Sequence, residues 1–290
     1  TYCGNLENLK DVENNPNYRF VHGNICDRKL VRELVSEVDC IVNFAAESHV
    51  DNSIKHPEVF IETNVQGTLN LLQSAKEIGI ERYLQVSTDE VYGTLGKTGY
   101  FYETTPLAPN SPYSASKASA DMLVRAFYET YKLPVLTTRC SNNYGPYQYP
   151  EKLIPFFISR LLNGEKVPVY GDGLNVRDWL YVYDHCAAID TVLHKGKIGE
   201  VYNVGGHNEK TNMEITRLIL DAMGKDESSI EYVQDRLGHD RRYAISNDKI
   251  TSELGWEPSV TFEQGIKMTI DWYLNNQEWI EHIEAKKVGV

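Results

Sequence analysis

Short apolar runs alternate with longer amphipathic stretches through the first half of the chain. The runs predict strands, and they lie at 18–25, 38–46, 82–93 and 133–145, the last two including their polar exits. The stretches between them predict helices at 28–37, 57–79 and 114–132. The run VDCIVNFAA at 38–46 is continuously apolar, which is typical of a strand covered on both faces. This alternation indicates βαβ units and an α/β fold built on a doubly wound, parallel, Rossmann-like sheet.

The alternation loosens after about Glu151 and predicts a smaller α+β lobe. Helices are expected at 152–164, 183–196, 212–224, 246–254 and 261–276, and strands at 200–206 and 230–233. The stretch 167–182 combines strands with glycine-marked turns, and the tail 283–290 should fray. We therefore expect two domains, 1–150 and 151–290, the first of which also receives later segments such as 178–204.

Three predicted strands turn abruptly polar where they end. The exits read AAESHVD at 45–51, STDEVYG at 87–93 and RCSNNYGP at 139–146. Ligands of open parallel sheets bind at the carboxyl ends of the strands. Within STDEVYG, the hydroxyl of Thr88 is followed by the carboxyl groups of Asp89 and Glu90. Carboxylates are rarely buried unless they are paired, so this exit predicts a functional site.

Tyr113 and Lys117 form a Y-x-x-x-K pair at the start of the predicted helix 114–132. Residues four apart share one face of a helix, and an ammonium beside a phenol lowers the phenol pKa. A phenolate made in this way can remove a proton from a substrate hydroxyl. Alone, the pattern is weak and also fits an ordinary helix surface. The sheet order, however, brings it to the same edge as Thr88, Asp89 and Glu90.

Composition narrows the function classes. The 290 residues carry a net charge of −12, which argues against a nucleic-acid-binding protein. No apolar run reaches the roughly 18 residues of a membrane span, and TYCGNLENLK is no signal peptide. The five cysteines are odd in number and widely spaced, which favours reduced thiols in a cytoplasmic protein over disulfides or a metal site.

Seven motifs in register resemble the nucleotide-sugar branch of the extended short-chain dehydrogenases, and within it the dTDP-glucose 4,6-dehydratases. They read AAESHVD, VSTDEVYG, SPYSASKASAD, TRCSNNYGPYQYPEKLIP, YGDGLNVRDWLYV, NVGGHNEKTN and DRLGHDRRYAI. The likeness runs from Thr1 to about residue 275. It implies a Rossmann-like NAD-binding domain at 1–150, a nucleotide-sugar-binding lobe at 151–290, and dTDP-glucose as the substrate.

The resemblance implies a role for each residue of the polar exit. The family oxidises the sugar at C4, eliminates water across C5 and C6, and returns the hydride to C6. Tyr113 would be the base for oxidation, helped by Lys117, and Thr88 would hydrogen-bond the C4 oxygen. Glu90 would take the C5 proton, and Asp89 would protonate the departing C6 hydroxyl. Two carboxyls in different environments suit such an elimination, whereas epimerases of this fold usually lack the pair.

The resemblance also implies the binding residues. Those expected along NAD, beside Tyr113 and Lys117, are Asn24, Ile25, Ala45, Ala46, Glu47, Thr63, Ser87 and Asn142. Those expected around the nucleotide sugar, beside Thr88 and Asn142, are Ser48, Lys152, Leu153, Pro168, Tyr170, Arg177, Asn212, Arg236 and His239. The Arg and Lys side chains suit a diphosphate because they form charge-assisted hydrogen bonds. No metal is expected.

The chain departs from the family pattern in three places. Asn24 stands where Asp is common, and Asn52 where Arg is common. The family's opening strand and G-x-x-G-x-x-G turn, which hold the NAD pyrophosphate, precede the point at which Thr1 aligns. We expect most of a dehydratase whose first few dozen residues are missing. Alternatives are a related UDP-sugar dehydratase, decarboxylase or epimerase, and a truncated, non-catalytic binding protein.

The resemblance implies a homodimer as well. Family members pair through two helices of each subunit, and the matching segments are 57–79 and 114–132. Their apolar stripes are wide for helices that cover one side of a sheet, although a broad core-facing stripe would look the same.

Overall fold

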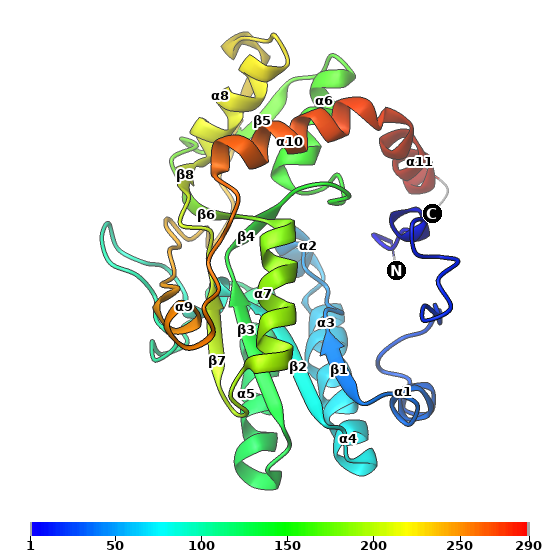
Figure 1. Ribbon diagram of the computed structural model, residues 1–290. Helices are drawn as coiled ribbons and strands as arrows, with labels where there is room; N and C mark the ends of the chain where they lie inside the picture. The colour runs from blue at the N-terminus through cyan, green and yellow to red at the C-terminus, as the bar shows by residue number, and fades with distance from the viewer. Residues whose placement is uncertain (1, 289–290) are drawn as a thin grey trace.

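A parallel sheet forms the lower lobe of the computed structural model, which describes residues 2–288 (Figure 1). Its strand order is β1-β2-β3-β7, and each neighbouring pair is parallel. The strands are β1 (Cys40–Asn43), β2 (Arg82–Thr88), β3 (Val135–Cys140) and β7 (Val201–Val204). Thr88 pairs with Cys140, so the polar ends of β2 and β3 reach the same edge of the sheet. The predicted α/β class and parallel sheet are confirmed.

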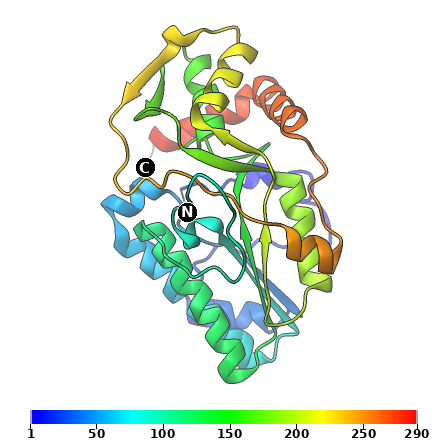
Figure 2. The same ribbon diagram turned by 90° about the vertical axis from the view of Figure 1, so that its left-hand side faces the viewer.

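Helices cover both faces of this sheet. On one face lie α1 (Arg28–Val35), α4 (Thr68–Ile78) and α5 (Pro112–Tyr131), and on the other α7 (Val182–Lys195) and α9 (Asp248–Leu254). Side chains of a strand point alternately to the two faces. Accordingly, Tyr83 of β2 packs with α4 and α5, whereas Leu84 packs with α7. Figure 2 shows α5 running along the side of the sheet.

The predicted helix 57–79 consists of three helical pieces. It begins as α3 (Pro57–Phe60), continues as the π-helical segment η2 (Ile61–Gly67), and ends as α4, which Gly79 caps at φ 83°. Before it lies the short helix α2 (Val50–Lys55). π-Helical turns insert an extra residue and often occur at functional sites.

The upper lobe is the predicted α+β part. Its helices are α6 (Leu153–Leu162), α8 (Asn212–Ala222), α10 (Phe262–Asn275) and α11 (Gln277–Val288). One small sheet has the order β4-β6-β8, with β4 (Asn142–Tyr144), β6 (Val176–Tyr181) and β8 (Glu209–Thr211), and another pairs β5 (Val167–Tyr170) with β9 (Ile230–Val233). Across both lobes, the described chain has single 3-10 turns at η1 (Leu6–Leu9), η3 (Asp89–Tyr92) and η4 (Glu227–Ser229). A separate aromatic core fills this lobe.

Three predictions about the ends of the lower lobe and of the chain are wrong in part. Residues 18–25 are not a strand, because they pair with no strand in the described part of the chain. The run 38–46 is a strand only at Cys40–Asn43. Within the strand, Ile41 packs in the core beneath α4 and Val42 packs against the core beneath α7, so both faces are covered, whereas Phe44 beyond it is 61% exposed. The tail does not fray at 283–288, which belongs to α11; residues 289–290 lie outside the described residues.

The N-terminal segment stabilises α11 by packing beside it (Figure 1). Trp279 Nε1 donates to Asn8 Oδ1 at 2.9 Å, and Lys286 Nζ donates to Asn5 Oδ1 at 3.0 Å. Contacts this distant in sequence leave no periodic signal, which explains why the tail looked free. Across residues 2–288, no helix combines the length and apolarity that crossing a bilayer requires.

A glycine in α10 gives a test of the upper core. A Cβ added to Gly265 would collide with the Tyr144 hydroxyl and lie 2.8 Å from Tyr144 Cζ. Gly→Ala inside a helix normally stabilises it, but overpacking a core costs about 1–3 kcal/mol. We expect Gly265→Ala to lower the free energy of unfolding by about 1–3 kcal/mol in urea titrations. Tyr144→Phe should reduce this loss, because it removes the clashing atom; an equal loss in both backgrounds would contradict the packing account.

Candidate active site

The site begins where β2 ends. Thr88 caps the turn η3, because its Oγ1 accepts the backbone N–H of Glu90 at 3.2 Å. The cap turns the chain sharply and places both carboxyls at the sheet edge. Asp89 is only 1% exposed, and the Thr88 hydroxyl lies 3.5 Å from its Oδ1. Its Oδ2 has no hydrogen-bond partner among residues 2–288. The buried acid therefore has unused hydrogen-bonding capacity.

The start of α5 brings Tyr113 and Lys117 to the same place. Ser111 caps this helix by a reciprocal pair of bonds with Ser114, and Pro112 occupies its first turn. Lys117 is buried and its Nζ donates to the carbonyl of Val86 on β2 at 2.8 Å. This bond fixes the predicted Y-x-x-x-K pair against the end of β2.

Burial governs the ionisation of this pair. It raises the pKa of Tyr113 well above its ordinary value, helped by the charges of Glu90 and Asp89, while a hydrogen bond with Thr88 opposes the rise. Burial also lowers the pKa of Lys117. Desolvation thus dominates the phenol pKa, and the Lys117 ammonium, which donates to the Val86 carbonyl, is not among the groups that shift it most. That Lys117 lowers the phenol pKa stays a prediction.

The two carboxyls have different electrostatic surroundings. Burial raises the pKa of Asp89 well above its usual range, and the neighbouring carboxyls of Glu90 and Asp178 raise it further. Burial also raises the pKa of Glu90, but the charges of Arg177, Lys152 and Arg236 oppose this rise. Asp89 therefore favours its protonated form more strongly than Glu90 does. Such a pair can supply one acid and one base.

The cations that face Glu90 come from the upper lobe. Arg177 of β6 donates from Nη2 to the carbonyl of Asp240 at 2.9 Å and stacks 4.2 Å from the Tyr243 ring centroid. Lys152, just before α6, donates from Nζ to the Ser48 carbonyl at 3.1 Å and lies 3.3 Å from the Ser48 hydroxyl. The structure thus brings together cations predicted from distant motifs.

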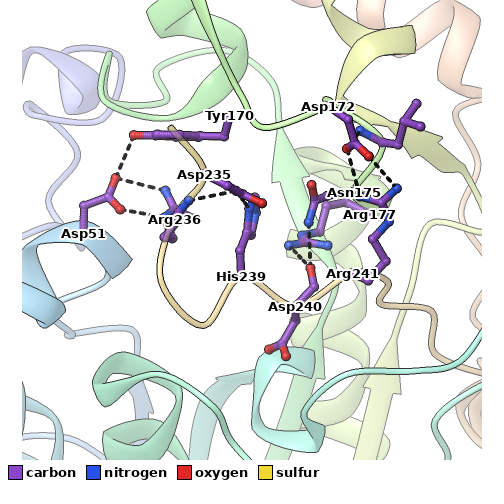
Figure 3. A network of polar contacts seen from close by, with 11 residues as sticks. Asp51, Tyr170, Asp172, Asn175, Arg177, Asp235, Arg236, His239, Asp240 and Arg241 are labelled. Carbon is purple, nitrogen blue, oxygen red and sulfur yellow. Dashed lines mark hydrogen bonds and ion pairs between the residues drawn. The ribbon is translucent and has the colours of Figure 1, made fainter. Parts of the chain in front are cut away.

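Arg236 and His239 lie on the loop after β9 (Figure 3). Arg236 binds Asp51 through two bonds, at 2.6 and 3.0 Å, and the Tyr170 hydroxyl donates to the same carboxylate at 3.2 Å. His239 Nδ1 lies 2.6 Å from Asp235 Oδ1. Burial lowers the pKa of His239 despite this carboxylate. The other predicted substrate residues of this lobe lie at element ends: Leu153 begins α6, Pro168 and Tyr170 are on β5, and Asn212 begins α8.

The residues predicted along the cofactor line the lower lobe. The loop with Ala45 and Ala46 leaves β1, and Asn64 of η2 holds Glu47 by bonds to its backbone N–H and carbonyl at 2.8 and 2.9 Å. Thr63 is on η2, and Asn142 begins β4. Ser87, on β2, has a buried hydroxyl without a hydrogen-bond partner in the described chain. The unpartnered Ser87 hydroxyl, the Asn142 amide and the Lys117 ammonium are polar groups that fit a polar cofactor such as NAD.

Asn24 and Ile25 lie beside α4 and not beside the carboxyl pair. Asn24 Oδ1 accepts the N–H of Cys26 at 2.9 Å, so this side chain shapes a turn. The carbonyl of Ile25 accepts a bond from Asn70 of α4 at 2.6 Å. The structure therefore gives these two predicted residues a local structural role.

Sequence reasoning missed several residues that hold the site in place. Asp51 holds the Arg236 guanidinium, and Asn64 holds the backbone of Glu47. The Sγ of Cys140 lies 3.4 Å from the carbonyl oxygen of Ser87. Burial raises the pKa of the Cys140 thiol to about 12, so it stays protonated at neutral pH. A weak signal for Asp51 existed, because it closes the polar exit AAESHVD. In residues 2–288, no three His, Cys, Asp or Glu side chains gather in a way that could hold a metal.

Comparison with known proteins agrees with this site. The family model of GDP-mannose 4,6 dehydratase matches residues 1–269. A dTDP-glucose 4,6-dehydratase of Xanthomonas campestris pv. campestris is 57% identical over 98% of this chain and 86% of its own. The solved dTDP-glucose 4,6-dehydratase of Streptomyces venezuelae, with NAD bound, is 52% identical and superposes with a TM-score of 0.96 over 98% of this chain and 88% of that one.

More distant enzymes share the fold. The UDP-glucose 4-epimerase of Thermotoga maritima, solved with UDP-glucose, is 31% identical and has a TM-score of 0.87 over 94% of this chain and 88% of that one. Identity is thus far higher to the dehydratases than to this epimerase. The chain belongs to the extended short-chain dehydrogenase family that the GDP-mannose 4,6 dehydratase model describes, and within it to the dTDP-glucose 4,6-dehydratases.

Proposed function

We propose that this chain catalyses the NAD-dependent removal of water from dTDP-glucose, giving dTDP-4-keto-6-deoxyglucose. One observation carries the proposal: two adjacent carboxyls, Asp89 and Glu90, share the end of β2 with Thr88 and the Tyr113–Lys117 pair. Removing water requires an acid and a base in addition to the base for oxidation, whereas epimerases of this fold usually lack the carboxyl pair. The relatives named as dTDP-glucose 4,6-dehydratases support the same substrate.

The lower lobe, residues 1–150 with 178–204, is the proposed NAD-binding domain. The residues proposed to hold NAD are the loop at 45–47, Thr63, Ser87, Asn142 and the Tyr113–Lys117 pair, with Asn24 and Ile25 at the adenine end. NAD, when bound, would accept the hydride from sugar C4 and supply the hydride that C6 receives. The orphaned Ser87 hydroxyl and the NAD bound to the Streptomyces venezuelae relative support this assignment.

Tyr113 is the proposed base for the C4 hydroxyl. Its raised pKa keeps the phenol protonated, so Tyr113 must first lose its own proton to solvent, a loss that a nearby cation favours, before it can accept the proton of the C4 hydroxyl. Lys117, one helical turn away, is the proposed cation. Thr88, which hydrogen-bonds the phenol, is proposed to bond the sugar C4 oxygen as well. Proton removal from the hydroxyl then accompanies the loss of hydride from C4.

The carboxyl pair then performs the elimination. The C4 ketone acidifies the C5 proton, and Glu90, which faces three cations, is the carboxylate that removes it. Asp89, protonated because it is buried beside other carboxyls, gives its proton to the departing C6 hydroxyl. Water leaves and a C5–C6 double bond remains. When C6 receives hydride, Glu90 would return its proton to C5.

The upper lobe, mainly residues 151–290, is the proposed nucleotide-sugar-binding domain. Lys152, Arg177 and Arg236 are proposed to bind the diphosphate, because they supply N–H donors on the side of the site that faces Glu90. Around them lie the other proposed substrate residues, which are Ser48, Asn142, Leu153, Pro168, Tyr170, Asn212 and His239. Five free cysteines support a cytoplasmic location.

The first test follows the mass of the sugar nucleotide. The protein is incubated with NAD and dTDP-glucose, and the products are analysed by mass spectrometry. We expect the loss of one water. Asp89→Asn combined with Glu90→Gln should reduce the rate at least about 100-fold, because both the acid and the base are removed. An unchanged rate would show that the assigned roles are wrong, and an unchanged mass with NAD bound would favour another nucleotide sugar.

The pH dependence of kcat separates the two carboxyls. Glu90 must be ionised, so the rate should rise as pH increases through its raised pKa. Asp89 must be protonated, so the rate should fall as pH increases through its pKa, which burial raises further. The profile is therefore bell-shaped. In Asp89→Asn, the residual rate should lose the falling limb; a falling limb that persists would assign it to another group.

A homodimer through segments 57–79 and 114–132 is also proposed. Its support is a set of exposed apolar side chains on these helices, namely Val59, Ile61, Ile78, Met122 and Tyr131. We expect Ile61→Glu combined with Met122→Glu to convert a dimer into a monomer in sedimentation-velocity experiments. Tyr183→Glu, an exposed aromatic on α7 across the sheet, is the control that should leave the dimer intact. A wild-type monomer would overturn the proposal.

A further inference from the structure

Asp51 connects the two lobes through Arg236 (Figure 3). Asp51 is in the first turn of α2 in the lower lobe, and Arg236 is on the loop after β9 in the upper lobe. Nε and Nη2 of Arg236 donate to the two carboxylate oxygens at 2.6 and 3.0 Å. Parallel bonds of this kind fix the plane of the guanidinium as well as its position.

The pair leaves Arg236 able to bind a ligand. A guanidinium carries five N–H donors, of which Asp51 uses the Nε hydrogen and one Nη2 hydrogen. Both Nη1 hydrogens and the second Nη2 hydrogen are not used by Asp51. Tyr170 completes the support, because its hydroxyl bonds Asp51 and its ring lies 5.2 Å from the guanidinium carbon. Asp51 therefore orients the guanidinium by binding its Nε side, and the Nη1 side keeps its donors for a ligand.

Glu90 is a competing carboxylate for Arg236. The Arg236 charge lies close enough to oppose the rise in the Glu90 pKa. A guanidinium released from Asp51 could turn toward Glu90, where it would neutralise the proposed base and leave the diphosphate without its donor. Asp51 stays ionised in this position, because the Arg236 guanidinium holds its pKa below the ordinary value although burial alone would raise it.

A second ion pair on the same loop offers a matched comparison. Arg241 also binds its carboxylate, that of Asp172, through two bonds, at 2.9 and 3.0 Å, although it donates from Nη1 and Nη2 whereas Arg236 donates from Nε and Nη2. Both residues of this second pair belong to the upper lobe. Their side chains are 53% and 55% exposed, whereas those of Arg236 and Asp51 are 21% and 25% exposed. Exposed pairs contribute little, whereas the shielded pair lies at the site.

We propose that Asp51 is a positioning residue, which holds the Arg236 guanidinium in the orientation that binds the diphosphate of the nucleotide sugar and keeps it away from Glu90. The inference rests on the proposed function for the identity of the ligand. It adds to that function a carboxylate of the cofactor lobe that prepares a phosphate-binding cation of the substrate lobe.

The test is a double-mutant cycle on the NAD-loaded protein with thymidine diphosphate as the probe. Isothermal titration calorimetry gives Kd, steady-state kinetics give KM and kcat, and thermal unfolding reports the fold. Asp51→Asn should weaken binding and raise KM about tenfold, which is the effect of losing one charged, bidentate support. The variant's kcat should change less than about threefold, because at saturation the bound diphosphate holds the guanidinium away from Glu90. Asp51→Glu should restore binding to within about threefold, because it keeps the carboxylate.

The background variant and the control make the result decisive. In Arg236→Lys, which cannot form the bidentate pair, Asp51→Asn should weaken binding less than about twofold further. Asp172→Asn should bind the probe like the wild type. Equal losses from Asp51→Asn in both backgrounds, an equal loss in Asp172→Asn, or unchanged binding would overturn the proposal. If the wild type binds the probe yet removes no water from dTDP-glucose, the proposed function fails while the cycle still decides the role of Asp51.

Discussion

The desolvation of two adjacent carboxyls at the end of β2 is the constraint on which the rest of the structure depends. A buried carboxyl must find a partner or keep its proton. Burial, helped by the carboxyls of Glu90 and Asp178, raises the pKa of Asp89, whereas the cations near Glu90 oppose the rise that burial causes there. One exit loop therefore holds the proposed acid and the proposed base side by side, and their difference arises from the surrounding residues, not from their own chemistry.

Those surroundings require two lobes. The carboxyls and the Tyr113–Lys117 pair belong to the sheet lobe, but the cations that oppose protonation of Glu90 come from the upper lobe. Bonds from Lys152 to Ser48 and from Arg236 to Asp51 hold the two sets together. Both contacts reach the polar exit 45–51, which also lines the proposed NAD groove. The same short segment thus meets the cofactor side and the substrate side of the site.

Much of this was readable in the sequence, for physical reasons. Strand and helix periods gave the parallel sheet, and strand exits gave Thr88, Asp89 and Glu90 because such sheets collect their exits at one edge. Contacts between distant segments were not readable. Periodicity contains no trace of the bond between Trp279 and Asn8, nor of the bond from Lys117 to the Val86 carbonyl. Segment 18–25 shows the opposite error. Its sequence pattern predicted a strand, but a segment forms a strand only when a neighbouring strand lies beside it to accept its hydrogen bonds.

The π-helical segment Ile61–Gly67 fixes the number of residues between α3 and α4. Its buried Asn64 reaches Glu47 on one side and Ser116 of α5 on the other, while α4 just beyond it places Leu71, Leu72 and Ala75 in the core. One residue corresponds to roughly 100° of helix rotation. Deleting a residue to make a regular α-helix would therefore turn either Asn64 from its partners or α4 from the core. Homologous sequences should vary in composition along this helix but tolerate no gap within it.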